Sequence, residues 1–394
     1  MAEQAESNES LVSGRKRKNI FIGIITLAAF FLILSSSDTA IEYMKKGLRL
    51  CAATVIPSLF PFMVISELIV SSGIGLRISR AFAKPMRWLF GVGEAGAAAY
   101  LLGLVCGFPI GAKTAVSMYD RGIVSRSELE RLLTFCNNPG SAFVISAVGV
   151  SLLGNKKVGI ALYVCVILSS LTVGIVGKYL LGYKRGSSIG NSMMIQSDFS
   201  IKMLTSAFAS SALSMLTVCA YVVFFSAFVG CIGAVLSHLS LPCEVLACIF
   251  GFFELSSGVG AAAAVSDRIC AVLLCALFVG WSGLSVGFQI MSVCAGRDIS
   301  FKPYFIAKAA QGVICCLFMM IAVRFVLKDA VFDAVPSFPY IETSAETLLL
   351  PISVIITAIF SIYAGICSIR SHRAKKRKKA EKSKKLLKFF SKRY

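Results

Sequence analysis

Charged side chains are scarce in this sequence, and histidine is nearly absent. Of the 394 residues only 15% are charged, and just two are histidines. Soluble domains carry roughly 25% charged residues, so this composition excludes an ordinary soluble protein. The fourteen cysteines form no CxxC pair and lie mostly inside apolar runs, which argues against a zinc or haem site and against a disulfide framework. We expect no cofactor and no resident metal.

Long hydrophobic runs are what the chain has instead. Hydrophobic residues make up 57% of it, and several apolar stretches exceed the ~18 residues that indicate a membrane span. We therefore predict an all-α polytopic membrane protein. Because further spans follow it, the first stretch is interpreted as a retained helix rather than a cleaved signal peptide. The predicted apolar segments are 20–36, 50–71, 95–118, 132–153, 158–182, 204–236, 244–266, 269–293, 304–326 and 347–369.

The distribution of Lys and Arg predicts the orientation of these segments, because basic loops favour the cytoplasmic side. Basic residues mark the loops at 77–87, 184–185 and 297–302 and the C-terminal tail, whereas 329–346 is acidic. Ten full crossings would contradict this pattern. It fits about eight crossings, with 95–118 and 244–266 as re-entrant hairpins and both termini in the cytoplasm; only Lys156-Lys157 is then misplaced.

The basic tail carries thirteen Lys or Arg residues and one acid from Arg370 onward. Directly after a span, such a run is typical of a topogenic anchor or of contact with anionic lipid, and we expect no nucleic acid. The predicted organisation is a cytoplasmic segment 1–18, a first half 19–182, a cytoplasmic linker 183–203, a second half 204–327, an external loop 328–346, a last span 347–369 and a cytoplasmic tail 370–394.

Four helix breaks recur in matched order. Hairpin 95–118 contains Gly-Phe-Pro-Ile-Gly-Ala-Lys and precedes Asn-Asn-Pro-Gly-Ser, whereas hairpin 244–266 contains Gly-Phe-Phe-Glu-Leu-Ser-Ser-Gly and precedes Gly-Trp-Ser-Gly-Leu-Ser. The corresponding glycines are 144 and 143 residues apart, which indicates an internal repeat. By the charge argument the two repeats are inverted. Paired interrupted segments of this kind are the best sequence pointer to a transporter binding site.

Polar and ionisable residues at these breaks are the candidate site. Freed backbone and amides beside Pro139 can hold a cation or a polar substrate. Lys113 either attracts a carboxylate or extends to the interface, and Glu254 binds substrate, sodium or a proton. Each Ser or Asn taken singly also fits a helix–helix hydrogen bond. The candidate residues are Gly107, Pro109, Lys113, Asn137, Asn138, Ser141, Glu254, Ser256, Ser282, Ser285 and Gln289.

These motifs resemble a known family. Gly103–Gly149, with its Gly-Phe-Pro-Ile-Gly-Ala-Lys and Phe-Cys-Asn-Asn-Pro-Gly strings, looks like the YlbJ-type sporulation integral membrane proteins of the nucleoside-recognition (GATE) group, and Gly280–Phe305 is also similar. A more distant resemblance runs to concentrative nucleoside transporters. It rests on Ser127-Glu128-Leu129, Phe253-Glu254-Leu255 and Gly280–Gly287, and it implies that Glu254, Ser282 and Ser285 are site residues.

The first hairpin departs from the nucleoside carriers. Their Gln-Thr-Glu is replaced by Phe108, Pro109 and Ile110, which offer no side-chain hydrogen bond, so a nucleoside should bind poorly. The YlbJ-type resemblance implies transport of dipicolinate, a dicarboxylate, and Lys113 fits such an anion. We therefore expect a non-enzymatic carrier for a small polar or anionic metabolite, coupled to Na⁺ or H⁺. A nucleoside carrier and a non-transporting scaffold or sensor are the alternatives.

The same reasoning places the protein in the bacterial cell membrane. The outer forespore membrane is expected if the host sporulates. Its expected partners are the small-molecule substrate, the lipid bilayer with anionic lipid at the tail and, as an open option, further copies of the chain.

Overall fold

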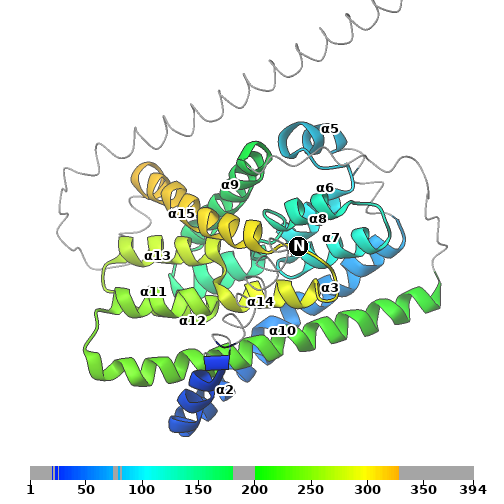
Figure 1. The fold of residues 1–394 in the computed structure, drawn as a ribbon. Helices are drawn as coiled ribbons and strands as arrows, with labels where there is room; N and C mark the ends of the chain where they lie inside the picture. Colours follow the sequence, from blue (N-terminus) through cyan, green and yellow to red (C-terminus); the bar gives the residue numbers. More distant parts are fainter. Residues whose placement is uncertain are drawn as a thin grey trace, which may run out of the picture. The chain divides into compact units, whose positions relative to one another are not determined.

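The computed structural model describes residues 20, 23–24, 26–73, 79, 82–180 and 200–327, and over these ranges the chain is helical with no β-strand (Figure 1). Its elements are a helix Thr26–Ser35, α2 Ser37–Leu50, η1 Cys51–Val55, α3 Ile56–Ser71, α5 Ala83–Pro85, η2 Met86–Phe90, α6 Gly96–Cys106, α7 Ile110–Asp120, α8 Arg126–Leu133, η3 Ala142–Leu152, α9 Lys156–Leu180, α10 Ile201–Leu236, η4 Ser237–Leu239, α11 Cys243–Phe253, α12 Leu255–Ala263, α13 Arg268–Trp281, α14 Gly283–Val293 and α15 Lys302–Phe325. The elements η1, η2 and η3 are π-helical, and η4 is a 3₁₀ turn.

Four helical segments of the described chain are long and apolar enough to cross a membrane, and a fifth is added if one bent pair counts as a single span. The four are Lys156–Tyr179, Ile201–Leu239, Arg268–Val293 and Lys302–Phe325. The coarse prediction of an all-helical membrane protein is therefore confirmed. The helix α10 has 36 residues. At a rise of 1.5 Å per residue that is ~54 Å, well beyond the ~30 Å hydrocarbon core.

The predicted hairpin regions consist of short helices packed in pairs. The arms α6, α7 and α11 have 11 residues each and α12 has 9. Eleven residues span ~16 Å, about half of the hydrocarbon core. No single arm can cross it. In each region the second arm packs against the first, α7 on α6 and α12 on α11.

The segment between the first two predicted spans is also helical, although it was not among the predicted apolar segments. After a bend of 98° the chain continues from Thr26–Ser35 into α2, η1 and α3. The helix α2 was missed because its apolar residues lie on one face and form no continuous run. Glu42 and Lys46, one turn apart, form a 2.7 Å ion pair on its exposed side. Both α2 and α3 pack against α10.

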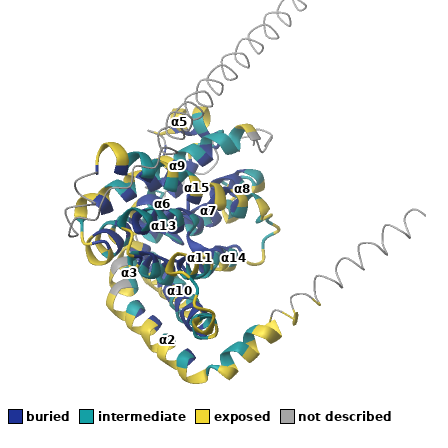
Figure 2. Ribbon diagram, turned by 90° about the vertical axis from the view of Figure 1, so that its left-hand side faces the viewer, coloured by how far each residue is buried: buried dark blue, intermediate teal, exposed yellow. Residues whose placement is uncertain are grey.

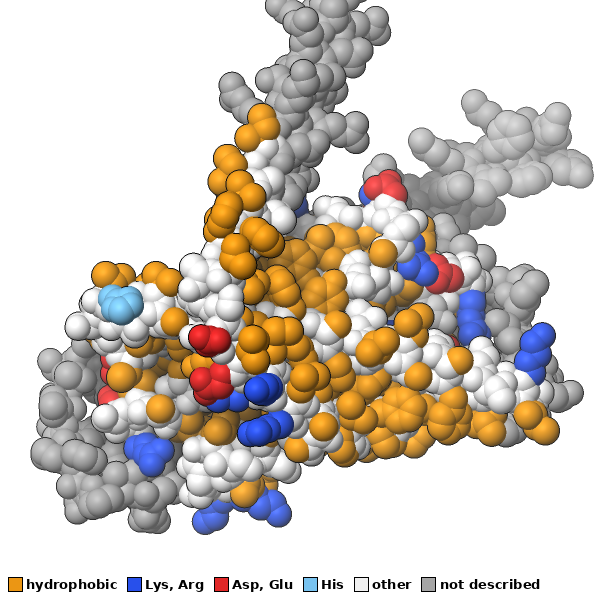
Figure 3. Space-filling view, turned by 90° about the horizontal axis from the view of Figure 1, so that it is seen from below, with side chains coloured by type: hydrophobic (Ala, Val, Ile, Leu, Met, Phe, Trp, Pro, Cys, Tyr) orange, Lys and Arg blue, Asp and Glu red, His pale blue; other side chains and the backbone are white. Residues whose placement is uncertain are grey.

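Two large clusters of buried apolar side chains form the core, seen as the dark interior of Figure 2. The first joins α6, α7 and α8 to α14 and the start of α15. The second joins η3 and α9 to α12, α13 and the rest of α15. Alanine, cysteine and valine supply more than half of the buried residues in each cluster. Many large apolar side chains remain exposed, and Figure 3 shows them covering much of one face. Lipid is the environment in which such a face is stable.

Several predicted parts lie outside the described residues. These are segment 1–18, most of the linker 183–203, and the loop 328–346, last span 347–369 and tail 370–394.

Candidate functional site

The tip of the first hairpin is packed directly against the break in the next span. Gly107 lies between α6 and α7 with φ 84° and ψ −179°, a conformation that essentially only glycine adopts. A Cβ there would lie 2.6 Å from Gly140 N. Further along the two arms, Gly103 and Gly111 face each other and both contact the carbonyl of Cys136. A Cβ on either glycine would lie within 2.1 Å of Cys136 O. Glycine is therefore required where hairpin and broken span meet.

The side chains of Asn137 and Asn138 are buried and fully engaged in this contact. Asn137 Oδ1 accepts from the backbone N–H of Ala112 at 2.8 Å, which ties the break to α7. The amide nitrogens of Asn137 and Asn138 donate to the carbonyls of Leu133 and Phe135, at the end of α8. Both side chains thus hold the unwound backbone in place, which is the structural role that the sequence left open for them beside ligand binding.

A buried lysine on α15 completes the first break. Lys308 is 1% exposed, and its ammonium donates to Asn137 O at 3.1 Å and to Gln311 Oε1 at 2.8 Å. Gln311 Nε2 in turn donates to Asn138 Oδ1 at 2.7 Å. The sequence analysis missed this pair, although the rule that an ionisable residue inside a span marks function applies to Lys308 as it does to Glu254.

In the second hairpin Glu254 forms the turn between α11 and α12. Its carboxylate accepts from Ser256 N at 2.9 Å and Ser257 N at 2.6 Å, which makes it the N-cap of α12. Glu254 is 3% exposed. The arms meet at Gly251 and Gly258, where a Cβ on Gly258 would lie 2.2 Å from Gly251 Cα. A similar glycine contact joins Gly103 and Gly111 in the first hairpin, so the structural counterpart of Gly251 is Gly103 rather than the Gly107 that the 144-residue offset pairs with it.

The second break repeats the arrangement of the first. Ser282 and Gly283 separate α13 from α14 with φ of 73° and 77°. A Cβ on Gly283 would lie 3.0 Å from Leu255 N and 3.3 Å from Glu254 Cα, so this break packs on the tip of the second hairpin. Next to it, Trp281 Nε1 donates to the carbonyl of Phe252 at the end of α11.

Two buried polar side chains beside the second break lack a hydrogen-bond partner within the described chain. They are Ser285, 1% exposed, and Gln289, 3% exposed, whose Oγ and Oε1 atoms are unpaired. They lie one turn apart on α14, which contacts α7 of the first hairpin and both arms of the second. An unpaired buried polar atom costs about 1–3 kcal/mol, so these two are the atoms best placed to bind a polar ligand.

Lys113 projects from α7 toward α3 rather than toward the second break. Its ammonium lies 3.1 Å from Glu67 Oε2, and both side chains are less than one-fifth exposed. Glu67 is not among the predicted site residues, because nothing in the local sequence pattern pairs residues 46 positions apart. Pro109 is buried at the tip of the first hairpin. Ser141 is half-buried at the first break, and Ser256 is half-buried at the start of α12 in the second hairpin.

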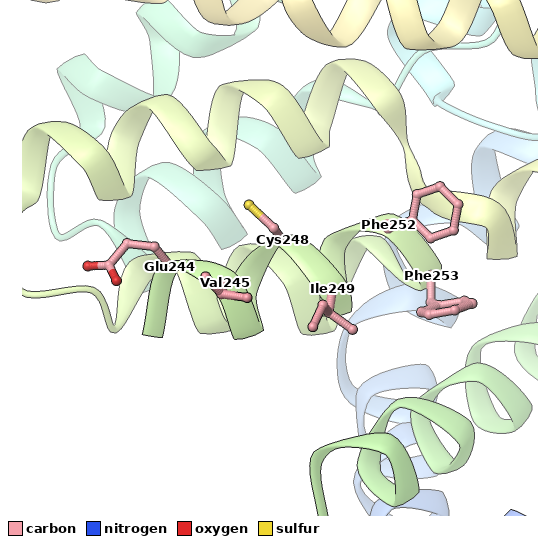
Figure 4. Close-up of a pocket in the computed structure, with 6 residues that line it drawn as sticks. All are labelled: Glu244, Val245, Cys248, Ile249, Phe252 and Phe253. Carbon is pink, nitrogen blue, oxygen red and sulfur yellow. The ribbon is translucent and has the colours of Figure 1, made fainter. Parts of the chain in front are cut away.

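An apolar recess of about 420 Å³ lies on the outer side of α11, lined by Glu244, Val245, Cys248, Ile249, Phe252 and Phe253 (Figure 4). All six come from one helix, and only Glu244 among them is charged. The recess therefore does not coincide with the polar residues of the two breaks. Over the ranges that the model describes, no group of three or more His, Cys, Asp or Glu side chains is arranged to hold a metal ion.

The comparisons with known proteins agree with the motifs. The chain is 29% identical over 341 residues to the sporulation integral membrane protein YlbJ of Bacillus subtilis (strain 168), a match covering 76% of this chain and 83% of that protein. No protein-family model and no solved structure matches it. The predicted resemblance to YlbJ-type membrane proteins is confirmed, and the apolar helices and this relative together identify an integral membrane protein.

Proposed function

We propose that this chain, a relative of a sporulation integral membrane protein, is a carrier that moves a small polar or anionic metabolite across the membrane by alternating access. One observation carries the proposal: each of two hairpin tips packs on the break of the helix that follows it, Gly107 on Gly140 and Glu254 on Gly283. Broken helices at membrane depth are tolerated where they are buried in protein or line a cavity, and in transporters they form the binding site.

Contacts between the halves support two inverted repeats. The return arm α7 of the first hairpin contacts α14, the distal part of the second broken span. Reciprocally, the return arm α12 contacts η3, the distal part of the first broken span. If a two-fold axis relates the two repeats, each return arm contacts the distal part of the other repeat's broken span in this way. The proposed architecture has eight crossings and two hairpins, and one repeat rocks or gates against the other.

Ionic contacts at one end of the molecule support the proposed orientation. Arg297 donates to both carboxylate oxygens of Asp120, at 2.7 and 2.5 Å. Arg126 pairs with Asp298, so the loop after α14 is bound to the region around α8 by two ion pairs. The basic-loop pattern assigned both regions to the cytoplasm, and their direct contact agrees with that. Hydrogen bonding to Asp120 also raises the pKa of Arg297 above its usual value.

The proposed substrate site lies between the hairpins, beside α14. Ser285 and Gln289 would supply hydrogen bonds that the folded chain leaves unmade. Four ionisable side chains lie on the surrounding elements, and their formal charges cancel: Lys113 and Lys308 against Glu67 and Glu254. Lys113 is paired with Glu67 on the α3 side, so an anionic substrate that took Lys113 as its partner would also have to compensate Glu67.

Uptake of labelled dipicolinate into proteoliposomes tests the proposal. Wild-type protein should support uptake above that of empty vesicles, and Ser285→Ala together with Gln289→Leu should reduce it. Glu254→Gln removes the charge with little change of shape and should also reduce uptake. Ser214→Ala is the matched control, because the Ser214 hydroxyl bonds only the carbonyl of Ser210 in its own helix. Uptake that survives all the site variants would refute the site assignment.

The same vesicles separate the alternative functions. An excess of uridine or adenosine should not compete with dipicolinate, whereas strong competition would favour a nucleoside carrier. A chain lacking 372–394 should retain its flux. If the truncated chain has normal flux but cannot replace the full-length chain in the cell, a scaffold or sensor function of the tail is favoured. In a sporulating host we propose the outer forespore membrane as the site of action.

A further inference from the structure

The first helix break holds a positive charge that comes from the protein itself. Lys308 enters from α15, and its ammonium donates to the backbone carbonyl of Asn137, in the unwound stretch that follows α8. Its other partner is the side-chain oxygen of Gln311. Both partners are neutral carbonyl oxygens. No carboxylate in the described part of the chain lies within ion-pairing distance of Lys308.

A buried ammonium without a carboxylate is costly. Moving an unpaired charge out of water carries an effective penalty of several kcal/mol, even after the protein relaxes. Asn137 O and Gln311 Oε1 offset part of that penalty, because both accept hydrogen bonds from the ammonium. An apolar residue at position 308, like most residues of α15, would avoid this penalty altogether.

Carbonyl and amide oxygens at the end of a half-helix are the ligands with which membrane carriers bind sodium. Here the acceptors are Asn137 O and Gln311 Oε1, and Asn138 Oδ1 is held next to them by Gln311. All of these residues are at most 1% exposed. The Lys308 side chain already binds two of these oxygens, Asn137 O and Gln311 Oε1. A metal ion cannot share them, because two cations in one buried site repel strongly.

We infer that Lys308 is a tethered cation that takes the place of a sodium ion at the first break. The break is then held closed on α15 without a metal ion, and Asn137 and Asn138 do not bind one. The consequence that transport is independent of sodium rests on the proposed carrier function. The claim that the site is filled by Lys308 does not.

Thermal unfolding of the purified full chain in detergent tests the inference without any substrate. The midpoint is compared in sodium chloride and in choline chloride at equal ionic strength. Wild-type protein should show no difference between them. Lys308→Ala should lose stability in choline chloride and regain part of it in sodium chloride, because the vacated oxygens can then accept the ion. Lys308→Met, which fills the space without charge, should have the same midpoint in both salts.

Two outcomes would overturn the inference. One is sodium-specific stabilisation of the wild-type protein, which needs no variant to fold. The other is a Lys308→Ala protein with equal midpoints in both salts. A flux arm addresses the consequence: wild-type uptake of dipicolinate should be unchanged when choline replaces sodium, and sodium dependence would contradict it. If no dipicolinate is carried at all, the proposed function fails, while the thermal comparison still decides the role of Lys308.

Discussion

Two glycines of α12 give a matched test of how the second hairpin is built. Gly258 and Gly260 lie two residues apart on the same helix, but they face different surroundings. A Cβ on Gly258 would lie 2.2 Å from Gly251 Cα and 2.7 Å from Gly251 N, whereas a Cβ on Gly260 would meet nothing within 4 Å. Alanine should therefore be tolerated at one position and not at the other.

The magnitude follows from the two contacts. Carbon atoms pack at ~3.5–4.0 Å, so Gly258→Ala forces α11 and α12 apart by more than ~1 Å, and both obstructing atoms belong to the backbone. Overpacking of this kind costs about 1–3 kcal/mol. Alanine also favours a helix over glycine by about 1 kcal/mol at either position, and this gain cancels when the two variants are compared. Gly258→Ala should be less stable than Gly260→Ala by about 1–3 kcal/mol.

Unfolding in detergent can be followed with a thiol-reactive fluorophore, because buried cysteines such as Cys136, Cys275 and Cys315 react only after the helices separate. Midpoint temperatures rank the variants without assuming reversibility. We expect Gly260→Ala to match or exceed wild-type protein and Gly258→Ala to unfold below it. The reasoning is refuted if Gly258→Ala unfolds at or above Gly260→Ala.

The remaining predictions concern the first hairpin and the ionic contacts. Gly107→Ala should abolish uptake and lower the unfolding midpoint, because it meets Gly140 N in a glycine-only conformation. Gly122→Ala, also at positive φ but in open space, should cost only the backbone strain of about 1–2 kcal/mol and keep its flux. Asp120→Asn removes a partly exposed pair with Arg297, so it should change stability by at most about 1 kcal/mol, and the difference should shrink in high salt. A midpoint that falls equally at low and high salt would contradict the surface character of that pair.

Local pattern in the sequence was sufficient to identify the helix breaks. Gly-Phe-Pro and Asn-Asn-Pro-Gly are poorly compatible with a continuous helix. Similar segments follow them 144 and 143 residues later, and this recurrence is evident from the sequence alone. The helices α6, α7, α11 and α12 begin and end within a few residues of the predicted hairpins. The helix α2 was not predicted, because a one-sided helix has no continuous apolar run to detect.

The scarcity of charges and the long apolar runs were enough to identify a helical membrane protein. In a membrane, backbone N–H and C=O groups must find their hydrogen bonds within the protein, and long apolar helices meet that requirement. Which charges matter was decided by tertiary structure alone. Pairing Lys113 with Glu67, and placing Lys308 against the carbonyl of Asn137, joins residues 46 and 171 positions apart. Sequence spacing cannot encode such contacts. They arise when α3 packs on the first hairpin and α15 packs on the first break, where each lysine loses water and bonds to protein atoms instead.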